Sequence, residues 1–93
     1  MNTRRKLGYC YPGYSYCGPG CTGPGKPTNE VDACCKLHDE CYARHGRTLG
    51  CDEFFYACLS PKINNFSKVG REAALFTNVI KLRNNFFSNQ SRL

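Results

Sequence analysis

Eight cysteines in a chain of only 93 residues constrain this sequence more than any other feature. A domain of this size buries too little apolar surface to be stable without cross-links. An even number of cysteines in a short, loop-rich sequence predicts four disulfides and an oxidising compartment. Eight cysteines allow on the order of a hundred pairings, so their number alone does not give the connectivity.

The densest group of reactive side chains lies between Cys34 and Tyr42, with the sequence Cys-Cys-Lys-Leu-His-Asp-Glu-Cys-Tyr. In a helix these residues form two neighbouring stripes, about 100° apart around the axis. One stripe consists of Cys34, His38 and Cys41, and the other of Cys35, Asp39 and Tyr42. A base and a carboxylate, His38 and Asp39, are therefore fixed side by side. A zinc site is the alternative, but adjacent cysteines are poor zinc spacing and no paired Cys-x-x-Cys set is present.

The segment 8–27 is rich in Gly, Pro and Tyr, a composition that excludes a helix or a central strand. Its three cysteines, Cys10, Cys17 and Cys21, indicate that the loop is nevertheless held in place. An ordered Gly-rich loop turns backbone carbonyls and amides towards something small, and carbonyl oxygens suit a hard cation such as calcium. The tyrosines of this segment either pack the loop or touch lipid head groups.

The rest of the chain predicts helices and no strands. Thr28 or Asn29 can cap the first helix and Gly46 can end it, whereas the second begins near Cys51 or Asp52. We therefore expect one small all-α domain over residues 1–93, stapled by disulfides. Its expected elements are the loop 8–29 and helices over 30–45, 51–62 and 68–87.

The third helix carries two apolar stripes. The first consists of Val69, Ala73, Phe76, Ile80 and Phe87, and the second of Leu75, Val79, Leu82 and Phe86. We expect both stripes to be core. The alternative is that one of them lines a lipid-sized slot or an interface.

The cysteine spacing predicts how the first two helices pack. Cys34 and Cys41 are seven residues apart, as are Cys51 and Cys58. Antiparallel helices joined by rungs two turns apart would then contain the disulfides Cys34–Cys58 and Cys41–Cys51. His38 lies about one turn from each of the two cysteines of the first helix. On this register Asp52 lies within roughly 3 Å of the level of His38 along the helix axis.

The Asp52 carboxylate could therefore reach one of the ring nitrogens of His38. The alternative is that Asp52 only caps the second helix. The natural partner of Cys35, on the Asp39 stripe, is Cys17 in the loop. Cys10 and Cys21 then pair by elimination.

The formal charge of +6 is unevenly distributed. Between Glu30 and Glu53 three basic residues stand against six acidic ones, whereas both ends of the chain are basic. This pattern suggests a cation site inside a surface that attracts anions, with solubility alone as the alternative. No recognisable nucleic-acid module is present, and we expect no nucleic-acid partner.

No apolar run approaches the ~20 residues that cross a bilayer, and no signal peptide is visible. If the protein is secreted, we expect this chain to be a mature form. The second histidine, His45, is expected on the surface. The sequence does not indicate an oligomeric state.

Three motifs together resemble the secreted calcium-dependent phospholipase A2 family. They are Tyr16-Cys17-Gly18-Pro19-Gly20, the stretch Asp32-Ala33-Cys34-Cys35-Lys36-Leu37-His38-Asp39-Glu40-Cys41-Tyr42, and Cys51-Asp52 with Cys58. The resemblance covers about residues 16–59. It implies that calcium (Ca²⁺) is held by the backbone carbonyls of Tyr16, Gly18 and Gly20 and by the Asp39 carboxylate.

The same resemblance implies the catalytic groups. His38 would be the general base, Asp52 its orienting partner and Tyr42 a hydrogen-bond donor to Asp52. The Gly18 amide would join calcium in the oxyanion hole. By the same resemblance, the family's core disulfides correspond to Cys17–Cys35, Cys34–Cys58 and Cys41–Cys51.

The chain departs from the family pattern in three places. Cys21 and Thr22 look like an insertion after the calcium loop, so Cys10–Cys21 has no family precedent. Only nine residues separate Cys41 from Cys51, so the hairpin and long middle segment of larger forms are absent. Gly and Pro replace the usual N-terminal amphipathic helix. We expect the third helix to supply the missing pocket walls.

The resemblance implies a secreted enzyme that hydrolyses the sn-2 ester of glycerophospholipids and releases a fatty acid and a lysophospholipid. Its partner would be a phospholipid membrane surface, and the basic ends favour anionic membranes. No Gly-x-Ser-x-Gly motif for a serine nucleophile is present. The alternative is a catalytically silent relative that binds lipid or a receptor, or acts as a toxin. The presence of His38, Asp39 and Asp52 favours the enzyme.

Overall fold

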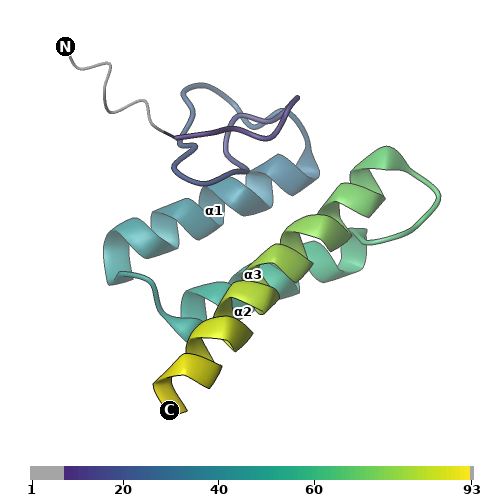
Figure 1. Cartoon of the computed structure of the whole chain (residues 1–93). Helices are drawn as coiled ribbons and strands as arrows, with labels where there is room; N and C mark the ends of the chain where they lie inside the picture. Colours follow the sequence, from purple (N-terminus) through teal and green to yellow (C-terminus); the bar gives the residue numbers. More distant parts are fainter. Residues whose placement is uncertain (1–7, 93) are drawn as a thin grey trace.

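The computed structural model describes residues 8–92, with side chains described up to residue 85. Within this range the chain forms three α-helices, one short 3-10 helix and no strand (Figure 1), which confirms the all-α fold class. The elements are α1 (Glu30–His45), α2 (Leu49–Leu59), η2 (Ser60–Lys62) and α3 (Lys68–Arg92). None of the described helices is long and apolar enough to cross a bilayer.

The ends of α1 follow from local hydrogen bonding. The Asn29 side chain accepts the N–H of Asp32 at 2.8 Å and so caps the helix. Gly46 ends it with a φ of 82°, and its N–H donates to the Tyr42 carbonyl. The helix therefore spans the same residues as the sequence pattern predicts.

α2 begins at Leu49, earlier than the sequence predicts. Thr48 caps this helix, because its hydroxyl accepts the N–H of Cys51 at 3.1 Å. Asp52 therefore lies inside the first turn and does not cap the helix, so that interpretation is wrong. The helix ends at Leu59, and the chain continues as η2 around Pro61.

All eight cysteines are oxidised, so the zinc interpretation is wrong. Two disulfides join α1 to α2, one joins the loop to α1, and one lies within the loop. They are Cys34–Cys58 and Cys41–Cys51, Cys17–Cys35, and Cys10–Cys21. The loop over residues 8–29 lies along one side of α1, and α2 and α3 lie on the other (Figure 1).

Only one of the two apolar stripes of α3 is core. Ala73 is fully buried and Phe76 is 9% exposed, whereas Val79 and Leu82 are 53% and 70% exposed. The expectation that both stripes are core is therefore wrong, because the rest of the described chain covers one face of α3. Phe86 and Phe87 lie outside the residues whose side chains are described.

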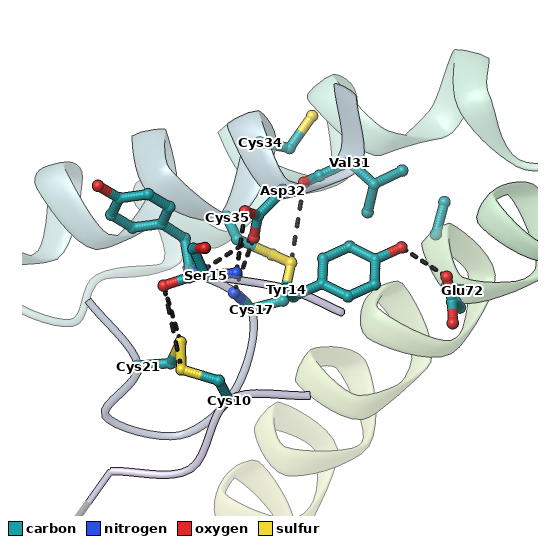
Figure 2. Close-up of a disulfide and its surroundings, with 12 residues drawn as sticks. Cys10, Tyr14, Ser15, Cys17, Cys21, Val31, Asp32, Cys34, Cys35 and Glu72 are labelled. Carbon is teal, nitrogen blue, oxygen red and sulfur yellow. Dashed lines mark hydrogen bonds between the residues drawn. A yellow bond between two sulfur atoms is a disulfide. The ribbon is translucent and has the colours of Figure 1, made fainter. Parts of the chain in front are cut away.

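A buried hydrogen bond ties the loop to α3 (Figure 2). The Tyr14 hydroxyl donates to the Glu72 carboxylate at 2.6 Å, and Lys68 pairs with the second oxygen of Glu72. Burial and this carboxylate raise the pKa of Tyr14 to about 12, so the phenol remains a donor. The rings of Tyr14 and Tyr11 each contact Phe76 edge-on, with centroids 5.2 Å away.

Tyr14→Phe leaves the Glu72 carboxylate buried with one donor fewer. We expect the free energy of unfolding to fall by about 1–2 kcal/mol, measured by urea denaturation with the disulfides intact. Tyr11→Phe is the matched control, since Tyr11 contacts the same Phe76 ring and its hydroxyl makes no hydrogen bond to a described residue. Equal stability losses in both variants would contradict the assignment.

Candidate active site

His38 and Asp52 form a buried pair between α1 and α2. His38 Nε2 lies 2.8 Å from Asp52 Oδ1, and both side chains are almost fully buried. The His38 ring stacks on Phe55, with centroids 4.2 Å apart. Burial lowers the pKa of His38, against the effect of its bond to Asp52, so the neutral ring is favoured. Because the carboxylate accepts from Nε2, Nδ1 is left with a free lone pair.

Asp52 has further partners on α1 and α3. The Tyr42 hydroxyl donates to Oδ1, and Asn84 Nδ2 donates to Oδ2 at 2.9 Å. Arg83 donates to the Tyr42 hydroxyl at 2.6 Å and lies 3.5 Å from Asp52 Oδ2. Burial acts to raise the pKa of Asp52. The hydrogen bonds from Tyr42, His38 and Asn84 outweigh this effect and hold the pKa below its ordinary value.

Arg83 and Asn84 were not predicted from the sequence. Both lie on α3, and neither belongs to a motif. A polar residue on an amphipathic helix is usually taken to face solvent.

A cavity of about 720 Å³ opens beside this pair. His38 and Asp39 line it together with the loop from Tyr16 to Gly20. A further part of the lining is apolar and comes from α2 and α3. It consists of Phe55, Leu75, Phe76, Val79 and Ile80. One part of the exposed stripe of α3 therefore lines a slot, which was the alternative interpretation of that stripe.

The loop is held by the segment that precedes it. The N–H groups of Tyr9 and Tyr11 donate to the carbonyls of Pro19 and Cys17, at 2.8 Å each. These carbonyls alternate along the chain with those of the expected calcium ligands. Gly18 has a φ of 136°, and a Cβ at this position would overlap the Tyr9 carbonyl. Only glycine fits there.

A second acid on α1, Asp32, holds the same loop and was not identified from the sequence. It is fully buried and accepts four backbone N–H groups, and Figure 2 shows those of Ser15 and Cys17. The four donors belong to Ser15, Tyr16, Cys17 and Thr28, at 2.8–3.2 Å. The sequence signal was present, but an acid in the first turn of a helix is equally explained by the helix dipole.

Asp39 lies two turns along α1 from Asp32, and its carboxylate is not satisfied. Its Oδ2 atom is buried and has no hydrogen-bond partner among the described residues. Burial, with the nearby charges of Asp32 and Glu40, raises the pKa of Asp39 to about 7. A buried oxygen without a donor is costly unless a cation or water satisfies it.

These residues fit a hard cation with oxygen ligands. Within residues 8–85 no three His, Cys, Asp or Glu side chains gather into a metal-binding group. A calcium site of this kind needs only one carboxylate, because backbone carbonyls provide the other protein ligands. The Gly18 carbonyl also accepts the N–H of Cys21 at 3.1 Å. A carbonyl oxygen has two lone pairs, so this bond leaves one available.

Comparisons with known proteins give the same resemblance. Residues 7–49 match the model of the phospholipase A2-like domain. The acidic phospholipase A2 homolog taipoxin gamma chain of Oxyuranus scutellatus scutellatus is 44% identical over 52 residues, which are 46% of this chain and 33% of that protein. An acidic phospholipase A2 of Austrelaps superbus is 39% identical over 57 residues, 52% of this chain and 36% of that protein.

The chain therefore spans about a third of the length of these curated relatives. No solved structure matches the chain.

Asp32→Asn tests the anchoring of the loop. The amide places an N–H₂ group against N–H donors, so we expect the free energy of unfolding to fall by about 3 kcal/mol in urea denaturation. Glu30→Gln is the control, because it removes the same charge from the first turn of α1 at an exposed position. If both variants lose the same stability, Asp32 acts through the helix dipole alone.

Proposed function

Since residues 7–49 of this chain are a phospholipase A2-like sequence, we propose that the protein is a calcium-dependent phospholipase A2. Its reaction is hydrolysis of the sn-2 ester of a glycerophospholipid, which gives a fatty acid and a lysophospholipid. The observation that carries the proposal is that His38, hydrogen-bonded to the buried Asp52, lines the same cavity as the unsatisfied Asp39 carboxylate.

In this proposal His38 is the general base. Its Nδ1 lone pair accepts a proton from the attacking water, and the same ring later returns the proton to the leaving alcohol. Asp52 holds the ring in the tautomer with hydrogen on Nε2 and stabilises the imidazolium that forms. Tyr42 and Asn84 keep the Asp52 carboxylate oriented.

The carbonyls of Tyr16, Gly18 and Gly20 and the Asp39 carboxylate would hold the calcium ion. When bound, the ion supplies positive charge that polarises the ester carbonyl and offsets the developing oxyanion. The Gly18 N–H is the proposed protein donor to that oxyanion. The apolar wall of α2 and α3 excludes water and receives the acyl chain.

We also propose secretion and action at a phospholipid membrane surface. Four disulfides support an oxidising compartment. The net charge of +6 supports attraction to anionic membranes.

A catalytically silent lipid-binding protein is the second candidate. One relative is named a homolog of a phospholipase A2. His38 and Asp39 line one cavity and Asp52 is hydrogen-bonded to His38, which favours the enzyme, since a silent protein has no need to keep this set.

The first test is fatty-acid release from phospholipid vesicles with calcium and with a chelator. We expect release only with calcium, and a loss of roughly a thousandfold in His38→Gln, because the general base is removed. His45→Gln is the control, as the other histidine is exposed. Release that persists in the chelator or in His38→Gln would contradict the mechanism. Vesicle binding without release by the folded wild type would favour the silent protein.

Asn84→Ala tests the support of Asp52 from α3. Loss of one hydrogen bond to the carboxylate is expected to lower kcat about fivefold to tenfold, with KM nearly unchanged. Asn78→Ala on an exposed position of α3 is the control and is expected to retain wild-type kcat. An equal change in kcat for the two variants would show that Asn84 does not position Asp52.

A further inference from the structure

Two arginines line the active-site cavity close to the Tyr42 ring. Arg47, from the connection between α1 and α2, and Arg83, from α3, both line it. Their guanidinium carbons lie 6.0 and 5.9 Å from the centroid of the same ring, that of Tyr42. Two segments distant in sequence thus bring two positive charges to one side chain that is part of the site.

The positive charge of Arg47 and Arg83 is only partly balanced by nearby acids. Arg83 lies 3.5 Å from Asp52, but its Nε atom is buried without a hydrogen-bond partner among the described residues. Arg47 is exposed and forms no ion pair with any described residue. Asp39, the acid that lines the cavity, is the expected cation ligand.

The apolar part of the cavity lining defines the other half of the ligand. Leu75, Phe76, Val79 and Ile80 present an apolar surface along α3. A molecule that fills the cavity therefore combines an apolar chain with negative charge. Guanidinium groups bind phosphate and carboxylate oxygens strongly because their N–H donors match both in geometry and charge.

We propose that Arg47 and Arg83 form a subsite for the negatively charged head group of a glycerophospholipid. The cavity itself then selects anionic lipids over zwitterionic ones, since a choline ammonium beside two guanidinium groups is repelled. The identity of the ligand as a glycerophospholipid rests on the proposed function.

This selection differs from attraction to an anionic membrane. A basic protein binds a negatively charged surface through all of its exposed lysines and arginines together. A single dissolved lipid molecule offers no such surface, so discrimination between dissolved lipids reports on the cavity.

The test measures binding of two short-chain lipids below their micelle concentrations, with calcium present. They are the ether-linked analogues of phosphatidylglycerol and phosphatidylcholine, which lack the scissile ester, so that binding does not depend on turnover. We expect the wild type to prefer the glycerol head group, and Arg47→Gln to reduce that preference about tenfold, because one of the two charges that repel the choline ammonium is removed.

Arg44→Gln is the matched control, since it removes the same charge from an exposed position that does not line this cavity. It is expected to keep the wild-type preference. The proposal is overturned if the wild type binds the two analogues equally, or if Arg47→Gln and Arg44→Gln change the preference equally. It is also overturned if Arg47→Gln weakens both analogues by the same factor.

Failure of the proposed hydrolysis gives a different result from failure of the head-group subsite. In that case no ester lipid is cleaved, while the preference among the ether analogues and its loss in Arg47→Gln remain measurable. If hydrolysis occurs, the ratio of kcat/KM for the two dissolved ester lipids is expected to follow the binding preference.

Discussion

The antiparallel register of α1 and α2 is the constraint on which the rest of the structure depends. Two disulfides spaced two helical turns apart prevent the helices from sliding or rotating past each other. His38 lies between these two rungs on α1, and Asp52 follows one of the bonded cysteines on α2. Their 2.8 Å contact is therefore set by covalent bonds, and a small hydrophobic core is sufficient to keep the pair buried.

Two acids on α1, two turns apart, have opposite surroundings. Asp32 accepts four backbone N–H groups and is satisfied by the protein alone. Asp39 is half-buried, and its buried Oδ2 atom has no hydrogen-bond partner among the described residues. The first carboxylate holds the loop on the helix, and the second remains available to a ligand. The same residue type thus serves structure or binding according to the donors that reach it.

The helices, their register and the proximity of His38 to Asp52 could be predicted because spacing along one helix determines which groups share a face. The contributions of α3 could not. No cysteine links α3 to the rest of the chain, so nothing in the sequence fixes which of its polar residues meet Asp52. For the same reason the exposed apolar stripe of α3 was expected in the core. Asp32 was overlooked because a first-turn acid already has a local explanation.

The positions of the disulfides also determine when the site can form after synthesis of the chain. All four lie in the loop, α1 and α2, and none reaches α3. A newly made chain with reduced thiols lacks every covalent restraint that aligns His38 with Asp52. The site is therefore assembled only after oxidation. For the proposed phospholipase, a reduced chain is therefore expected to be inactive until its disulfides have formed.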